Sequence, residues 1–135
     1  MDFQLDKKHQ MARRLFREFA ENEVKPLAIE TDEKEEFPRK TIEKMAASVF
    51  LGIPVAKEFG GQGCDPLTYV MCVEELAKCC GTTAVALSAH TSLCCDPIAQ
   101  FGTQQQKEKF LVPLAKGEKL GAFALTEPGA GTDAQ

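Results

Sequence analysis

The segment "TTAVALSAHTSLCCDPIAQFG", residues 82–102, contains no acidic or basic side chain other than His90 until Asp96. Such a segment, with apolar or small residues at nearly every position, forms a stable helix in a globular protein when other helices cover it. Membrane spans need about 20 predominantly apolar residues, and no stretch of this chain approaches that composition. We therefore expect a central helix at residues 82–100, surrounded by neighbours and more buried than the other helices.

Helical spacing also precedes this segment. Apolar residues recur at three- and four-residue steps from Asp6 to about Asn22, and again after Pro38. Pro26 marks a break in the first helix or the restart of a second, short one. The residues that we expect to face the core are Met11, Leu15, Phe16 and Phe19 in the first segment, and Ile42, Met45 and Val49 in the later one.

Two further helices are indicated by their first residues. Asp65 and Pro66 are typical of an N-cap and a first-turn proline, for a helix that runs through Cys80. Thr103 and Gln106 form a T-x-x-Q capping box for the next helix. The expected buried positions are Leu67, Val70, Met71, Val73, Leu76 and Ala77 in one, and Phe110, Leu111 and Leu114 in the other.

Only "KLGAFAL", near the C-terminal end, has the composition of a strand. The chain is therefore predicted to be mainly α, with about six helices in a domain at residues 1–119. More than half of residues 1–115 should be helical. Residues 120–135 would begin a different structural unit.

The charge balance disfavours a nucleic-acid-binding protein. The chain has 16 basic and 20 acidic residues, a formal net charge of −4, whereas binding DNA or RNA depends on neutralising phosphates. The N-terminal "MDFQLDKKHQ" lacks the apolar core of a secretory signal. We expect a cytoplasmic protein.

The six cysteines are expected to be free thiols. They include the adjacent pairs Cys79–Cys80 and Cys94–Cys95, whose geometry is poor for disulfides, and no C-x-x-C pair is present. A metal site built from Cys72, Cys79, His90 or Cys94 is disfavoured, so we predict no metal.

The glycine-rich "TEPGAGTDA" admits several interpretations. Gly129-x-Gly131-x-x-Ala134 formally matches a dinucleotide-binding fingerprint, but it lacks the helix and the acidic residue about twenty positions later that a Rossmann unit requires. A plain glycine-rich turn is a second reading. A third is an anion-binding loop, in which backbone amides and the hydroxyls of Thr126 and Thr132 approach the ligand.

The motifs "GIPVAKEFGGQG", "VEELAKCCG", "SAHTSL" and "FGTQQQKEKFLVPLAKGEKLGAFALTEPGAGTDA" occur in this order. The chain thereby resembles the N-terminal part of the acyl-CoA dehydrogenases, from about Phe3 to Ala134, and is most similar to the short-chain, butyryl-CoA type of fermenting bacteria. The resemblance implies an N-terminal helical domain, here residues 1–119, a central β-domain that begins at 120–135, and a C-terminal helical domain. It also implies that FAD lies between the β-domain and the C-terminal helices, that a neighbouring subunit completes its site, and that the full-length protein is a homotetramer.

The resemblance assigns candidate site residues. Phe123, Leu125 and Thr126 match positions beside the isoalloxazine ring of FAD, and Gly131 and Thr132 match positions beside its pyrophosphate, with Thr132 also near the pantetheine of CoA. Positions that line the acyl pocket are matched by Val85, Ala86, Ala89 and Leu93, whose spacing places them on one stripe of a helix. Ordinary strand packing and a core stripe would have the same sequence pattern.

The implied reaction is α,β-dehydrogenation of a short-chain acyl-CoA, or the reverse reduction. The family's catalytic carboxylate lies in the C-terminal domain and no acidic residue here matches it, so we expect no catalytic residue in this chain and no turnover by the chain alone. Phe19 and Phe50 match the docking pocket for an electron-transferring flavoprotein. The alternative function is a stand-alone helical interaction module without catalytic activity.

Overall fold

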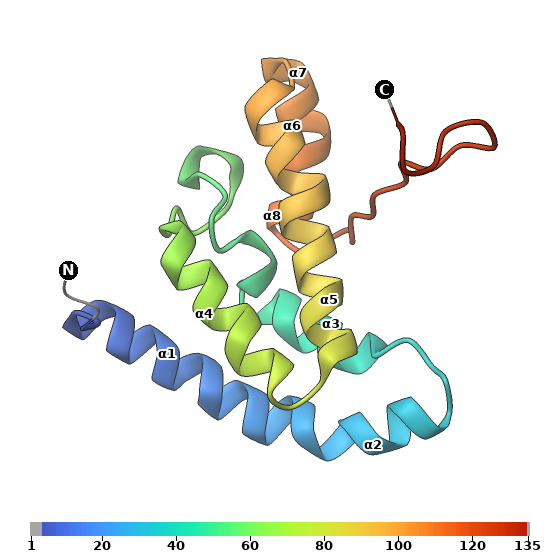
Figure 1. The fold of residues 1–135 in the computed structure, drawn as a ribbon. Helices are drawn as coiled ribbons and strands as arrows, with labels where there is room; N and C mark the ends of the chain where they lie inside the picture. The colour runs from blue at the N-terminus through green and yellow to red at the C-terminus, as the bar shows by residue number, and fades with distance from the viewer. Residues whose placement is uncertain (1–3, 135) are drawn as a thin grey trace.

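The computed structural model describes residues 4–134, so Phe3 and Gln135 lie outside it. Helices joined by turns account for more than half of residues 1–115, which confirms the mainly α prediction (Figure 1). Within the described residues they form five continuous helical stretches. These are α1 (Lys7–Phe19), η1 (Ala20–Val24) and α2 (Lys25–Glu33); then α3 (Arg39–Ala47); then α4 (Pro66–Ala77); then α5 (Gly81–Ser88), η4 (Ala89–Cys95) and α6 (Asp96–Phe101); and last α7 (Gln104–Gln106), η5 (Lys107–Leu111) and α8 (Val112–Ala115). Two 3-10 turns, η2 (Phe50–Gly52) and η3 (Lys57–Phe59), separate α3 from α4.

Three of these stretches contain a π-helical segment that ends just before a proline. The residue before each proline donates its backbone N–H to the carbonyl five residues earlier: Lys25 to Ala20, Asp96 to Thr91, and Val112 to Lys107. A proline has no N–H, and in a regular α-helix its ring meets the carbonyl four residues earlier. The wider π turn accommodates the ring. Pro26 therefore marks a restart of the helix and not a break.

The helix caps lie where the sequence predicts them. The Asp65 carboxylate accepts a hydrogen bond from the Thr68 N–H at 2.8 Å. Thr103 and Gln106 form the reciprocal capping box. Both caps join groups only three residues apart, which is why local sequence predicts them.

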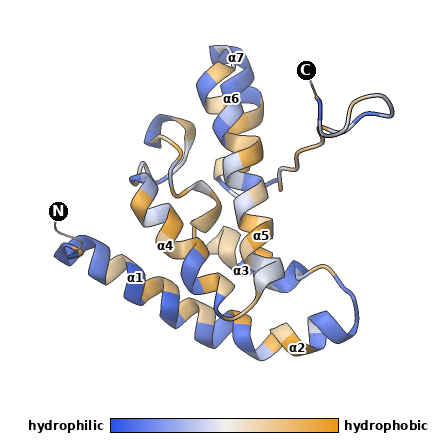
Figure 2. Cartoon of the chain, in the orientation of Figure 1, coloured by the Kyte–Doolittle hydropathy of each residue, from blue (hydrophilic) through white to orange (hydrophobic). Residues whose placement is uncertain are grey.

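The main core lies where α1, α3, α4 and α5 meet, around the fully buried Met45, Leu51, Leu76 and Leu87. A smaller cluster, around Leu111 and Cys95, packs under the last helical stretch. Figure 2 shows α1 alternating between hydrophilic and hydrophobic residues, as expected for a helix with one covered face. None of the helices in residues 4–134 is long and apolar enough to cross a membrane.

The predicted buried faces of α1 and α4 are partly wrong. Phe16, Met71 and Leu76 are buried, but Met11 is 74% and Val70 is 55% exposed. The reason is that the two helices meet through charged groups as well as apolar ones: Arg13 and Arg17 of α1 bind the buried carboxylate of Glu75 on α4. Other positions in the predicted stripes that are exposed are Leu15, Val49, Leu67 and Ala77.

The helix at residues 82–100 is not covered on every side, contrary to the prediction. Within the described chain, α4 packs against α5 and η2 against η4, so that one face is buried. The opposite face is open: Val85 is 67% and Leu93 is 46% exposed. Phe110, expected to face inward, is likewise 46% exposed, whereas Leu111 and Leu114 are buried as predicted.

The last helical stretch ends in a Schellman motif at Gly117. The Gly117 N–H donates to the Leu114 carbonyl, the Glu118 N–H donates to the Pro113 carbonyl, and Gly117 has a φ of 74°. After this turn the chain leaves the helices as an irregular segment (Figure 1). The expected strand at "KLGAFAL" does not form within the described residues, which supply no sheet for it to join; the only bridge there is Glu127–Ala130.

Candidate functional site

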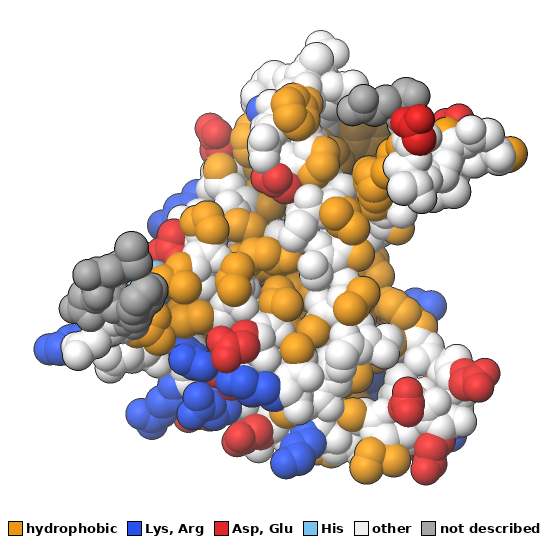
Figure 3. All heavy atoms as spheres, in the orientation of Figure 1, with side chains coloured by type: hydrophobic (Ala, Val, Ile, Leu, Met, Phe, Trp, Pro, Cys, Tyr) orange, Lys and Arg blue, Asp and Glu red, His pale blue; other side chains and the backbone are white. Residues whose placement is uncertain are grey.

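The candidate acyl-pocket residues share the open face of the α5–η4 helix. Val85 and Leu93 are exposed, and Ala86 and Ala89 are half-buried. Residues of the opposite face are buried in the bundle: Thr83, Ala84, Leu87, His90, Thr91 and Cys95. In the space-filling view, apolar side chains gather along the centre of the molecule (Figure 3). The helix thus presents an apolar stripe of the kind that a pocket wall requires.

The glycine-rich tail, defined as residues 121–134, is joined to this helix at its first residue. The Gly121 N–H donates a hydrogen bond to Nδ1 of His90 at 2.9 Å. Gly121 also lies so close to η4 that a Cβ there would stand 2.5 Å from Sγ of Cys94. The structure therefore brings the start of the tail beside the helix that bears the acyl-pocket candidates, a contact for which the sequence offered no signal.

Beyond Gly121, the candidate flavin residues are exposed. Phe123 is 51% and Leu125 is 58% exposed, and Thr126, Gly131 and Thr132 are also accessible. The Glu127–Ala130 hydrogen bonds form a tight turn, and a Cβ at Gly131 would meet no atom within 4 Å. Open amides and threonine hydroxyls fit an anionic ligand such as a pyrophosphate. They form an open edge and not an enclosed cavity.

His90 and Cys95 lie close enough to suggest a nucleophile and a base, with Nε2 and Sγ 3.4 Å apart. Both residues are fully buried. Burial raises the pKa of the Cys95 thiol to about 12. Burial also lowers the pKa of His90, against the effect of the Leu51 and Leu114 carbonyls, which raise it. The pair is therefore uncharged and inaccessible, unlike a reactive cysteine.

All six cysteines are free. Among residues 4–134, no three His, Cys, Asp or Glu side chains group closely enough to hold a metal ion.

Phe19 and Phe50 lie together at a groove between α1, η1 and η2. Their ring centroids are 4.7 Å apart, and Phe16 packs edge-on against Phe50 at 5.3 Å. Phe50 is only 5% exposed, so it forms the floor of the groove and not an exposed aromatic surface. The groove is lined by Leu15, Glu18, Phe19, Asn22, Glu23, Ser48 and Phe50.

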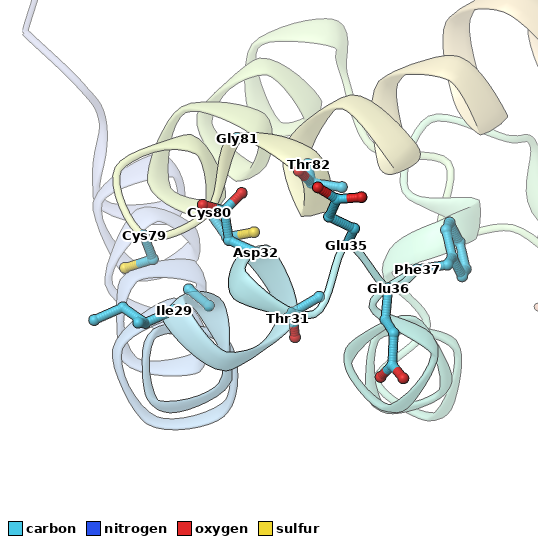
Figure 4. Close-up of a pocket in the computed structure, with 11 residues that line it drawn as sticks. Ile29, Thr31, Asp32, Glu35, Glu36, Phe37, Cys79, Cys80, Gly81 and Thr82 are labelled. Atoms are coloured by element: carbon cyan, nitrogen blue, oxygen red, sulfur yellow. The ribbon is translucent and has the colours of Figure 1, made fainter.

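A larger hollow lies between the end of α2 and the turn from α4 to α5 (Figure 4). Asp32, Glu35 and Glu36 line one side and Cys79 and Cys80 the other, with the Glu35 and Glu36 side chains pointing in opposite directions. Its lining has three carboxylates and no basic residue. That charge is unfavourable for CoA or FAD phosphates, and none of the candidate site residues lies there.

Comparison with known proteins identifies the family of this chain. Residues 6–118 match the model of the "Acyl-CoA dehydrogenase, N-terminal domain" family. The chain is 59% identical over 133 residues to the short-chain specific acyl-CoA dehydrogenase of Clostridium acetobutylicum, covering 98% of this chain and 35% of that protein. It thus spans about a third of the length of the curated relatives that it matches.

Two solved structures are similar over 99% of the chain. Butyryl-CoA dehydrogenase from Megasphaera elsdenii matches with a TM-score of 0.91 and 46% identity, over 36% of its chain. A chain in the structure of the electron transferring flavoprotein of Acidaminococcus fermentans matches with a TM-score of 0.94 and 48% identity, over 35% of its length. With a family model that covers most of its residues, this chain belongs to the acyl-CoA dehydrogenase family and contains that family's N-terminal domain.

Proposed function

We propose that this chain is the N-terminal part of an FAD-dependent acyl-CoA dehydrogenase that acts on short-chain acyl-CoA thioesters, in the oxidative or the reductive direction. The observation that carries the proposal is the apolar stripe on α5 and η4, joined through Gly121 to an accessible glycine-rich tail. We propose that residues 1–119 form one domain and residues 120–135 the start of the next. The Schellman turn at Gly117 and the family match ending at residue 118 support this boundary.

In this proposal Val85, Ala86, Ala89 and Leu93 form one wall of the acyl pocket. An apolar wall binds the acyl chain because each methylene removed from water contributes about 0.8 kcal/mol. Small residues at 86 and 89 leave space between the helix and the substrate, while Val85 and Leu93 supply contact area. The bulk of these four side chains therefore influences which acyl length binds.

The tail would hold the cofactor along one edge. FAD, when bound, would accept the hydride removed from the β-carbon of the substrate. Phe123 and Leu125 would pack against the isoalloxazine ring, and the Thr126 hydroxyl would donate to it. The Gly131 amide and the Thr132 hydroxyl would donate to the pyrophosphate, and Thr132 would also approach the pantetheine. No residue of this chain is assigned the removal of the α-proton, so the chain alone would be inactive.

The groove at Phe19 and Phe50 is proposed as the docking site for an electron-transferring flavoprotein. Leu15, 55% exposed, and the half-buried Phe19 border a floor formed by Phe50, which suits a single apolar side chain of a partner. Similarity to a chain in the structure of the Acidaminococcus fermentans electron transferring flavoprotein supports a partner of this class. We further propose that the full-length protein is a cytoplasmic homotetramer, on the basis of the family resemblance.

Flavin titration tests the proposal. The longer protein that contains this sequence should be yellow and oxidise butyryl-CoA, whereas the 135-residue chain should be colourless and bind FAD in the tens of micromolar or more weakly. Losing about 5.5 kcal/mol of contacts weakens binding about ten-thousandfold. Submicromolar FAD binding or crotonyl-CoA reduction by the chain alone would contradict this account. A colourless, inactive longer protein that binds the flavoprotein would favour the interaction module instead.

Ala89→Leu tests the acyl wall in the longer protein. A larger side chain should exclude about one or two methylenes, so that specificity for hexanoyl-CoA over butyryl-CoA falls about fourfold for each methylene excluded. Ala77→Leu, an exposed position on α4 outside the stripe, is the matched control. An unchanged chain-length preference in Ala89→Leu would remove this helix from the pocket.

A further inference from the structure

One buried polar group has no role in the proposed reaction. His90 is completely inaccessible, at the second residue of the π-helical segment η4. Its ring lies where four parts of the chain meet: Cys95 of η4, the Leu51 carbonyl of η2, the Leu114 carbonyl of α8 and the Gly121 amide of the tail. A buried imidazole is costly unless its nitrogens are hydrogen-bonded. The ring nitrogens of His90 therefore need hydrogen-bond partners within the protein.

The contact with Gly121 determines the state of the ring. A backbone amide nitrogen can only donate, so Nδ1 must accept, and the proton of the neutral ring lies on Nε2. Nε2 then faces the Cys95 sulfur at 3.4 Å. A doubly protonated ring would place an N–H against the Gly121 N–H. Burial, which lowers the pKa of His90, favours the same neutral form.

Gly121 provides a second, independent observation. A Cβ at this residue would lie 2.5 Å from Sγ and 2.8 Å from Cβ of Cys94, and 3.3 Å from Cδ2 of Leu114. The tail therefore begins in a position that only glycine can occupy, pressed between η4 and α8. By contrast, Gly129 and Gly131 have no atom within 4 Å of a Cβ position. Close packing and the hydrogen bond thus act at one residue, two positions before Phe123.

The π-helical segment connects this contact with the acyl stripe. Ala89 precedes His90 directly and Leu93 follows three residues later, yet these two lie on the open face while His90 is buried. One short segment thus presents the stripe outward and holds the tail inward. Any shift of the tail along η4 would require the His90 hydrogen bond to break.

We propose that neutral His90 is a positioning residue, which holds Gly121 and thereby fixes the glycine-rich tail relative to the acyl stripe. This inference rests on the proposed function for the roles of tail and stripe. His90 touches neither flavin nor substrate in it. Its effect on FAD would pass through the Gly121 amide.

The first test uses the 135-residue chain and needs no cofactor. The Gly121 amide should exchange its hydrogen about fivefold faster in His90→Leu than in the wild type, since a net hydrogen bond contributes about 1 kcal/mol. His90→Asn, whose side-chain oxygen can take the place of Nδ1, should restore most of the protection. Nitrogen NMR of the wild type at pH 7 should show a protonated Nε2 and an unprotonated Nδ1.

Glycine variants test the same contact from the other side. Gly121→Ala should displace the tail and speed exchange of the residue 121 amide, even if His90→Leu folds poorly. Gly129→Ala is the matched control and should leave exchange at Gly121 unchanged. Equal exchange of this amide in wild type, His90→Leu and Gly121→Ala would overturn the inference.

The second test uses the longer, FAD-loaded protein. His90→Leu should raise the FAD dissociation constant about tenfold and alter the flavin absorbance spectrum, while His90→Asn should return both close to wild type. If His90→Leu has the same FAD affinity and flavin spectrum as the wild type, the inference about His90 is overturned and the proposed function is not. A wild-type protein that binds no FAD, with Gly121 exchange still dependent on His90, would instead refute the proposed function and the flavin part of this role.

Discussion

The α1–α4 seam and the α5–η4 face show two opposite uses of a helix surface. At the seam, Glu75 is 2% exposed and accepts hydrogen bonds from Arg13 at 2.8 Å, Arg17 at 3.3 Å and Lys78 at 2.8 Å. The buried carboxylate is thus fully paired, by three cations that remain partly exposed. On the α5–η4 face the reverse holds, because apolar side chains such as Val85 are left open.

The difference separates stability from function in this domain. A buried carboxylate persists only where cations satisfy it, and once paired it ties two helices that are distant in sequence. An open apolar stripe contributes little to folding of the described chain, so its residues are free to be chosen for a ligand or a neighbouring surface. Substitutions at the seam should therefore change unfolding, and those on the open face should change binding.

The largest expected difference in stability is between two Leu→Ala substitutions, one in the core and one on the open face. Leu76→Ala removes a fully buried side chain of α4 and should destabilise the chain by about 3 kcal/mol through the cavity that it leaves. Leu93→Ala, at a residue 46% exposed, should cost less than about 1 kcal/mol. Urea unfolding followed by circular dichroism measures both. Equal losses of unfolding free energy in the two variants would show that the open face contributes to stability as much as the core does.

Glu75→Gln should weaken the seam by about 2 kcal/mol. The change removes the buried partner of both arginines; Arg13 keeps its ion pair with Glu74 at 3.0 Å, and both arginines can regain water because they are partly exposed. The matched variant is Glu74→Gln, because the exposed Glu74 carboxylate pairs with the same Arg13 and Lys78, at 3.0 and 3.2 Å, and its loss should change stability by less than about 0.5 kcal/mol. Denaturant midpoints that shift equally in the two variants would contradict a special role for Glu75.

The Glu75 contribution should disappear in acid. Burial by itself raises the pKa of Glu75. The hydrogen bonds from Arg17, Arg13 and Lys78 lower it by more, so that the pKa is about 2 instead of the ordinary 4.5. The stabilisation is therefore complete above pH 4.5 and is lost as the pH falls towards 2. The difference in unfolding free energy between wild type and Glu75→Gln should shrink over this range. A constant difference from pH 6 to pH 2.5 would show that the carboxylate is not the cause.

The smallest expected effect lies at the outer end of the seam. His9 approaches Asp65 at 3.1 Å and Asp6 at 2.8 Å, and the hydrogen bond with Asp65 raises its pKa above the ordinary 6.5, against some desolvation. Its stabilising contribution is present below pH 6.5 and should fade as the pH rises through the raised pKa. Proton NMR titration of His9 measures this value. In Asp65→Asn the pKa should fall towards 6.5, and an unchanged value there would exclude Asp65 as its cause.

The residues after Lys119 should be the most mobile part of the isolated chain. Residues 122–129 are all exposed, so few contacts restrain them beyond Gly121. Amide exchange in the isolated chain should be fastest there and slow at Leu76 and Leu87. Protection throughout residues 122–129 would indicate a structure that this chain forms on its own.

Local sequence was sufficient for the features whose partners lie a few residues apart. The Asp65 cap and the Thr103–Gln106 box follow from residue types at a three-residue spacing, and helical periodicity located the main helices. The motif "LTEPGAGTDA" with its preceding segment was enough to indicate the family. Pro26 indicated an irregularity in the helix, but not that a π turn accommodates the proline ring.

The tertiary structure alone decided which apolar residues are covered and which polar residues are buried. Met71 and Val70 are adjacent and similar in hydrophobicity, yet one is 3% and the other 55% exposed. Glu75 looked like any surface glutamate, and His90 like an isolated histidine. Their environments depend on residues 62 and 31 positions away, Arg13 and Gly121. Burial and pairing are set by non-local neighbours, whose positions do not follow from local residue spacing.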